Sequence, residues 1–151
     1  MVMDLSKSAS EIVVGVDGSP GSIDALRWAA KQAELTGASL HAVTAWAFPE
    51  HRTPFGIVFD IASSADPTAL ARSELDGTIT TVLGRHENLE VTAEVIPGEE
   101  APVLLNAARG ADLLVVGSRG RGAFVGTLLG SVSERCVRHA ECPVVIVRHP
   151  E

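Results

Sequence analysis

The sequence contains little lysine and little positive charge, and these shortages exclude several classes of function. Its 151 residues carry a formal net charge of −7. Nucleic acids and anionic membranes both bind basic surfaces, so we expect no nucleic-acid partner and no membrane partner. The two lysines, Lys7 and Lys31, are far from any glycine-rich segment. The G-x-x-x-x-G-K-[ST] phosphate loop is absent, and a P-loop ATPase is not expected.

Cysteine and long apolar runs are also scarce. Cys136 and Cys142 have five residues between them, a spacing that fits neither a zinc site nor a C-x-x-C redox motif. We interpret them as reduced thiols near the core. No stretch approaches the roughly 20 apolar residues of a membrane span, and the polar N-terminus does not resemble a signal peptide. We expect a cytoplasmic protein with a flexible leader at residues 1–10 and a single domain at residues 11–151.

Apolar segments alternate with amphipathic ones along the chain. Ser19-Pro20 and Asp66-Pro67 each combine a capping residue with a proline, which predicts a helix start. Further helices are expected at residues 99–109 and from Ser131. Residues 47–66 show no period and are predicted to form a long loop, which in a compact domain is usually functional or mobile. Strands are expected at residues 11–16, 38–46, 89–95, 112–117 and 143–147.

This order of elements predicts an α/β fold of the Rossmann-like kind. It is an open five-stranded parallel sheet with helices on both faces. The uninterrupted apolar runs at 11–16 and 112–117 indicate central strands, whereas the alternation at 89–95 indicates an edge. The strand order 3-2-1-4-5 satisfies both. Ligands of such sheets bind where the strand order reverses, which here is after Asp17 and Gly117.

A glycine-rich segment, residues 117–130, follows the fourth predicted strand. Glycines let a phosphate approach the backbone, and free amides at the start of the next helix attract anions. Arg119 and Arg121 would add charge-assisted hydrogen bonds, and Arg135 and Arg138 lie nearby in sequence. The alternative is a flexible lid without a ligand. The dinucleotide fingerprint G-x-G-x-x-G is absent after the first strand.

The spacing within this segment resembles the ATP-binding branch of the universal stress protein family. That branch has G-x-x-G, nine residues, and then G-S, which correspond here to Gly117, Gly120, Gly130 and Ser131. Residues 14–19 are similar to the first strand of the family, and residues 142–147 are similar to its last. The resemblance extends from Glu11 over nearly all of the chain.

The resemblance implies a ligand, a site and an assembly. The ligand would be ATP with Mg²⁺, and the assembly a homodimer through the fifth strand, whose apolar residues lie at a predicted sheet edge. Asp17 would contact adenine or ribose, although an Asx turn would also explain it. The segment Thr44-Ala45-Trp46 departs from the histidine and branched residue common in the family. The expected nucleotide-binding residues are Gly15, Asp17, Ala45, Gly117, Ser118, Arg119, Gly120, Arg121, Gly122, Gly130, Ser131 and Val132.

No catalytic residue and no metal site is predicted. The histidines are scattered, and none has the partners that build a triad or a metal centre: His41, His51, His86, His139 and His149. We therefore expect a regulatory module of the stress response, in which ATP occupancy changes binding to an unknown protein partner. The alternative is an enzyme, either a slow ATPase or a nucleotidyl transferase of the adenine-binding α/β group.

Overall fold

The computed structural model describes most of the chain. The described ranges are 9–47, 51–53, 56–58, 66–86, 88–119 and 129–150, with 51–53 and 56–58 described for the backbone alone. Three sequence predictions therefore lie partly or wholly outside the described residues. They are the leader at residues 1–10, the loop at residues 47–66, and the nucleotide-binding residues Gly120, Arg121 and Gly122.

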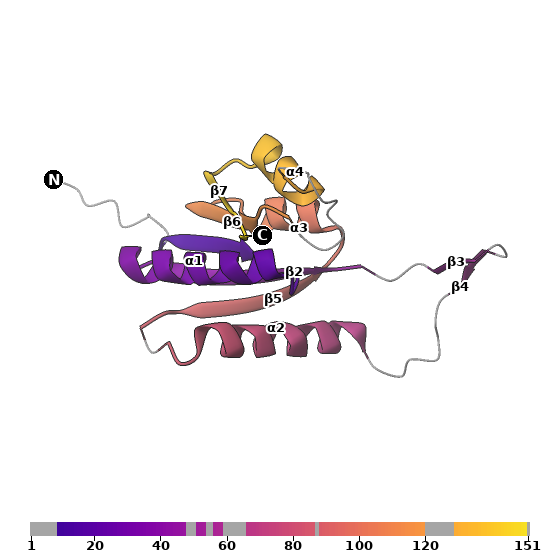
Figure 1. The fold of residues 1–151 in the computed structure, drawn as a ribbon, viewed down its shortest axis with the longest axis horizontal. Helices are drawn as coiled ribbons and strands as arrows, with labels where there is room; N and C mark the ends of the chain where they lie inside the picture. Colours follow the sequence, from indigo (N-terminus) through magenta and orange to yellow (C-terminus); the bar gives the residue numbers. More distant parts are fainter. Residues whose placement is uncertain are drawn as a thin grey trace.

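A five-stranded sheet forms the middle layer of the molecule (Figure 1). Its order is β5-β2-β1-β6-β7, and every neighbouring pair is parallel. This is the predicted order 3-2-1-4-5. The strands are β1 (Glu11–Gly15), β2 (Ser39–Trp46), β5 (Val91–Pro97), β6 (Leu113–Gly117) and β7 (Val144–Val147).

Helices cover both faces of the sheet, as predicted (Figure 1). One face carries α1 (Pro20–Thr36) and α2 (Pro67–Leu83), and the other carries α3 (Glu100–Ala107) and α4 (Ser131–His139). None of the helices in the described residues is long and apolar enough to cross a membrane.

The two long helices begin with the predicted caps. The Ser19 hydroxyl accepts a hydrogen bond from the amide of Ser22 at 3.3 Å, and Asp66 Oδ1 accepts one from the amide of Thr68 at 3.0 Å. Each cap satisfies an amide that the first helical turn would otherwise leave without a partner. Helix α1 ends at Gly37, whose φ of 75° lies in the left-handed region that glycine adopts without strain.

The sheet separates two apolar cores. Along β1, Ile12 and Val14 pack beneath α1 and α2, whereas Val13 packs beneath α3 and α4. Val13 and Val14 are fully buried, so β1 is a central strand, as its uninterrupted apolar sequence indicates. In β5, half-buried and exposed residues alternate along most of the strand, which confirms the predicted edge.

Residues 47–66 contain two strands that the sequence did not indicate. Strands β3 (His51–Thr53) and β4 (Gly56–Val58) pair antiparallel in a separate two-stranded sheet. Strands of three residues are too short to produce a recognisable alternation, and the prediction of a loop without strands was therefore wrong here.

Both cysteines are free thiols at the core beneath α3 and α4, as the sequence indicated. Cys136 is fully buried on α4, and Cys142 is half-buried in the connection to β7. Burial raises the pKa of Cys136 to about 11. Burial also raises the pKa of Cys142. Because the thiolate is the reactive form, both thiols should be poor nucleophiles at neutral pH.

We expect thiol labelling at pH 8 to distinguish native from unfolded protein. In the native state Cys142 should react more slowly than a free cysteine, and Cys136 should react only after denaturant is added. Counting labelled thiols by mass spectrometry in both states would measure this. Rapid labelling of two thiols in the native protein would contradict the burial of Cys136.

Candidate functional site

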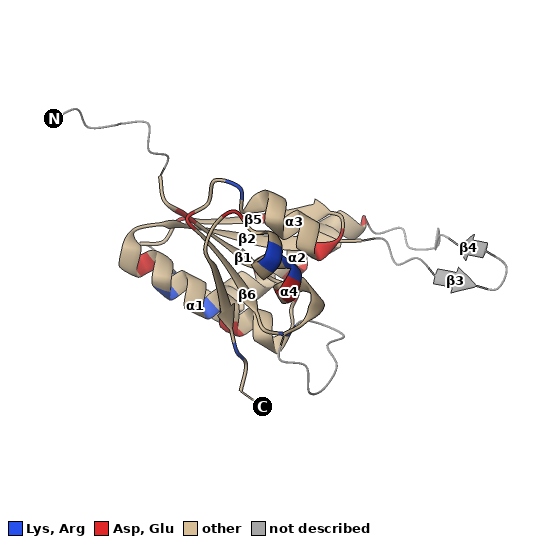
Figure 2. Ribbon diagram, turned by 90° about the horizontal axis from the view of Figure 1, so that it is seen from above, with Lys and Arg blue, Asp and Glu red and all other residues tan. Residues whose placement is uncertain are grey.

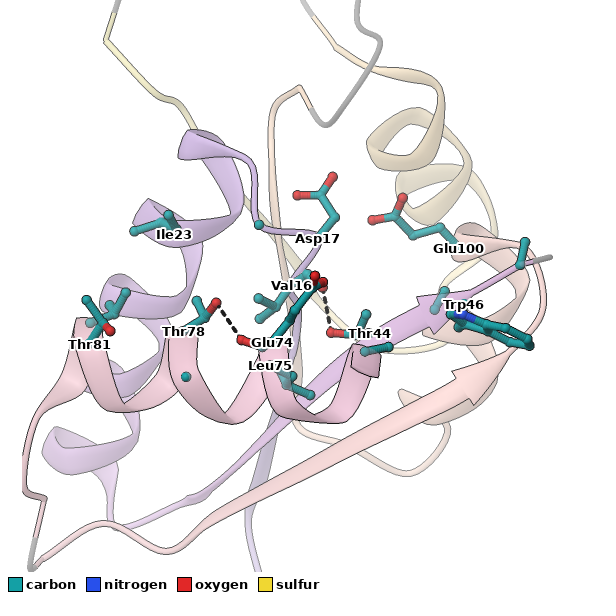
Figure 3. A pocket seen from close by; sticks show the side chains of 16 residues that line it. Val16, Asp17, Ile23, Thr44, Trp46, Glu74, Leu75, Thr78, Thr81 and Glu100 are labelled. Carbon is teal, nitrogen blue, oxygen red and sulfur yellow. Dashed lines mark hydrogen bonds between the residues drawn. The ribbon is translucent and has the colours of Figure 1, made fainter. Parts of the chain in front are cut away.

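A pocket of about 750 Å³ lies at the carboxyl ends of β1 and β2 (Figure 3). Helices α1, α2 and α3 also contribute to its lining. The buried side chains of Val16 and Leu75 form its floor. Its volume is typical of a site for a small organic ligand. The pocket lies next to β1, one of the two strands between which the strand order reverses.

Asp17 lines this pocket and also shapes the turn into α1. Its Oδ1 accepts hydrogen bonds from the amide of Ser19 at 2.9 Å and from the Ser19 hydroxyl at 2.5 Å. The Asp17 amide donates to the Ser22 hydroxyl at 3.3 Å. The Asx-turn explanation for Asp17 is therefore correct, and it coexists with a position in the pocket wall.

The end of β2 presents backbone groups to the pocket. Val43 O accepts from the amide of Val16 at 2.9 Å, and Trp46 O accepts from the amide of Gly98 at 2.7 Å. Alternate residues of a strand direct their backbone groups to the same side. Ala45 lies two residues after Val43, so its amide and carbonyl point to the side of β2 on which β1 and Asp17 lie.

Thr44 and Trp46 occupy the positions at which the chain departs from the family pattern, and both line the pocket. The Thr44 hydroxyl donates to the carbonyl of Val16 at 2.8 Å, so it holds the two strand ends together. Trp46 is half-buried at the end of β2.

Gly15 packs closely against α3. A Cβ at this position would lie 2.7 Å from Cδ1 of Leu104, and Leu104 is 1% exposed. The side chain of this leucine fills the space that a Cβ on Gly15 would occupy. The sequence could not show this contact, because the two residues are 89 positions apart in the chain.

Gly117, the first glycine of the spaced motif, packs against the first turn of α1. A Cβ on Gly117 would lie 2.8 Å from the carbonyl carbon of Gly21. Conversely, a Cβ on Gly21 would lie 2.8 Å from the carbonyl oxygen of Arg119. Two backbone segments thus touch directly where β6 ends and α1 begins.

The two ends of the glycine-rich segment are tied together. The amide of Gly130 donates to the carbonyl of Ser118 at 2.6 Å. The buried Ser133 hydroxyl lies 3.0 Å from the carbonyl oxygens of both Ser118 and Gly130. This hydroxyl therefore donates to the backbone at the ends of the segment. Helix α4 begins with Ser131, followed by Val132, and its start lies directly beside the end of β6.

The arginines of α4 are engaged on the surface (Figure 2). Arg135 lies 3.5 Å from Glu99, and Arg138 lies 2.9 Å from Glu134. The side chains of both arginines are more than half exposed. Arg119 is half-buried at the end of β6, and Arg121 lies outside the described residues.

Helices α2 and α3 add pocket residues that the sequence analysis missed. Glu74, Thr78 and Thr81 project from α2 toward the pocket, and Glu100 projects from the first turn of α3 (Figure 3). The spacing of four and three residues places the α2 side chains on one face. That signal is present in the sequence, but a solvated helix face gives the same pattern.

The described part of the chain holds no group of three His, Cys, Asp or Glu side chains suited to a metal ion. His41 lies 2.7 Å from Glu94 on the neighbouring strand β5, and neither residue lines the pocket.

Several known proteins are similar to this chain. A universal stress protein of Mycobacterium bovis is 35% identical over an alignment of 149 positions that covers 90% of this chain and 47% of that protein. The chain thus spans about half the length of the curated relatives that it matches. The universal stress protein UspA of Lactobacillus plantarum shares the fold with a TM-score of 0.76 and 23% identity, over 92% of this chain and 97% of that one.

One solved relative contains an adenine nucleotide. It is a universal stress protein in complex with cAMP, 27% identical, with a TM-score of 0.65 over 95% of this chain and 99% of that one. Residues 9–148 of the present chain match the universal stress protein family as a whole. The chain therefore belongs to the universal stress protein family.

Proposed function

We propose that this chain is an ATP-binding regulatory module of the stress response. The observation that carries the proposal is that a pocket and the tied ends of the glycine-rich segment follow two neighbouring strands. We call the pocket the nucleoside half-site and the ends of the segment, with the start of α4, the phosphate half-site. The pocket beside Asp17 lies at the end of β1. The tied ends of the glycine-rich segment, Ser118 and Gly130, follow β6, which pairs with β1.

The pocket has the character of a nucleoside site. Among the described residues, its lining includes the carboxylates of Asp17, Glu74 and Glu100 and no lysine or arginine. Carboxylates accept hydrogen bonds, so they suit the amino group of adenine and the hydroxyls of ribose. Phosphates would be repelled there. The backbone of Ala45 adds an amide donor and a carbonyl acceptor for the edge of the base.

The start of α4 has the character of a phosphate site. Gly130 precedes the helix, and no side chain caps the first amides. The partial positive charge of a helix N-terminus attracts phosphate, so the amides of Ser131 and Val132 would hold the phosphoryl groups. Mg²⁺ bound to the triphosphate would lower its repulsion from Asp17 and Glu100.

Fluorescence titration tests the ligand class. Trp46 lines the pocket, and Trp28 is the other tryptophan, so the Trp46→Phe variant gives the matched control. ATP should change the emission of the wild-type protein with a dissociation constant well below that of GTP, and the control should lose the change. Equal affinities for ATP and GTP would refute adenine recognition.

Turnover should be slow, because the sequence of the glycine-rich segment, residues 117–130, contains no His, Asp, Glu or Lys that could act as a base for water. We expect less than one ATP hydrolysed per protein per minute, far below the median enzyme rate of about 10 per second. Product is counted after incubation with ATP and Mg²⁺, with heat-unfolded protein as the blank. Sustained turnover near the enzyme median would favour the alternative, an ATPase or nucleotidyl transferase.

We also propose a homodimer through β7. The four residues of this strand are apolar and half-buried, and an uncovered apolar edge invites pairing with another strand. A twofold axis closes such an edge.

The variant Ile146→Lys should convert the dimer into monomer or aggregate. The matched control is Ile96→Lys, because Ile96 lies on the opposite edge strand, β5, and packs against the same core as Ile146. Sedimentation velocity at micromolar concentration should show a dimer for the wild type and for the control. A monomeric wild type would remove the proposal.

A further inference from the structure

We infer that Gly21 is a positioning residue for the nucleotide site, holding the phosphate half-site in register with the nucleoside half-site without touching the ligand. This inference rests on the proposed function. Gly21 is buried in the first turn of α1 and is not part of the spaced glycine motif.

The contact is between backbones, and it is reciprocal. A Cβ at Gly21 would lie 2.8 Å from the carbonyl oxygen of Arg119, and a Cβ at Gly117 would lie 2.8 Å from the carbonyl carbon of Gly21. A carbon atom is not accommodated at such distances, and a backbone group has no rotamer by which to move aside. Any side chain at Gly21 must therefore displace the chain around Arg119.

Gly21 lies between two hydrogen-bonded groups. On the α1 side, Ser19 and Ser22 hold Asp17 at the pocket. On the β6 side, Arg119 follows Ser118, whose carbonyl accepts the amide of Gly130. A displacement of Arg119 is thus passed to Ser118 and from there to the start of α4. The nucleoside half-site stays attached to α1, so the two halves would lose their register.

The variant Gly21→Ala isolates this role. Alanine favours helices more than glycine does, so the substitution should not weaken α1 by itself. The matched control is Gly37→Ala at the other end of α1. Gly37 has a φ of 75° and no atom within 4 Å of an added Cβ, so its variant is strained without contacting the glycine-rich segment.

Two measurements are made on each protein. The first is amide hydrogen exchange of Gly130 by NMR without ligand. The second is the pair of dissociation constants for ATP and for adenosine, which lacks phosphates. In Gly21→Ala, Gly130 should exchange at least tenfold faster. The affinity for ATP should fall about tenfold, as for the loss of one charge-assisted hydrogen bond, and that for adenosine should change less than twofold.

The control separates these effects from a general loss of stability. Gly37→Ala should lower the melting temperature and keep the wild-type ratio of ATP to adenosine affinity. An equal fall in both affinities for Gly21→Ala, or unchanged exchange of Gly130, would overturn the inference. A wild-type protein that binds no ATP would refute the proposed function, while the exchange of Gly130 would still decide whether Gly21 sets the position of the segment.

Discussion

Replacing Gly120 and Gly130 together with valine is expected to abolish ATP binding and leave the fold intact. Gly130 has a φ of −73°, which any residue adopts, so valine there adds no left-handed strain. The effect should come from bulk, because the side chain would occupy the approach to the first amides of α4. The stability of a domain this size is about 5–15 kcal/mol, so the fold should survive the two substitutions.

Thermal unfolding with and without ATP measures this effect. Ligand at 100 times its dissociation constant stabilises a native protein by about 2.7 kcal/mol, so ATP should raise the melting temperature of ATP-stripped wild type. The melting temperature of the double variant should not move, and its circular dichroism spectrum should match that of stripped wild type. Unchanged ATP affinity in the variant would mean that the segment is a lid and that the phosphates bind elsewhere.

The second large effect concerns Gly15 and Leu104. Leu104→Ala should lower the free energy of unfolding by about 2–5 kcal/mol, because it leaves a cavity in a buried core. Gly15→Val should lower it by about 1–3 kcal/mol through overpacking against the same leucine. Gly15→Val adds volume at the contact where Leu104→Ala removes it. The double variant should therefore lose clearly less free energy of unfolding than the sum of the two single losses.

Urea denaturation of the four proteins gives this coupling directly. Val103→Ala is the matched control, since Val103 is the buried neighbour of Leu104 on α3 and is not among the atoms nearest an added Cβ at Gly15. The losses from Gly15→Val and Val103→Ala should simply add. Additive losses for Gly15→Val and Leu104→Ala as well would show that Gly15 is not a glycine for packing reasons.

The sheet was predictable because its strands carry local signals. Unbroken apolar runs identified β1 and β6 as central, and the alternation along β5 identified an edge. The cap-then-proline pairs at Ser19 and Asp66 located the starts of α1 and α2. Each of these signals acts over a few residues, so each can be read without knowing what lies across the fold.

The site was predictable only in its position. The strand order predicts a site at the end of β1, where a pocket lies, but it does not give the reasons for the glycines nearby. Gly15 and Gly117 make room for Leu104 and Gly21, and these contacts join segments that are distant in sequence. The α2 side chains Glu74 and Thr78 face the pocket, yet their spacing equals that of a solvated helix face.

The pairing of β1 has a consequence during biosynthesis. On one side it pairs with β2, which follows after a single helix, but on the other it pairs with β6, and Ile12 is matched to Leu113. During synthesis, α1 and α2 are therefore complete before β6 has been made. In that interval one apolar edge of β1 has no neighbouring strand. Such an edge is prone to association with other chains. Chains truncated before Leu113 should therefore depend on chaperones more than the full chain does.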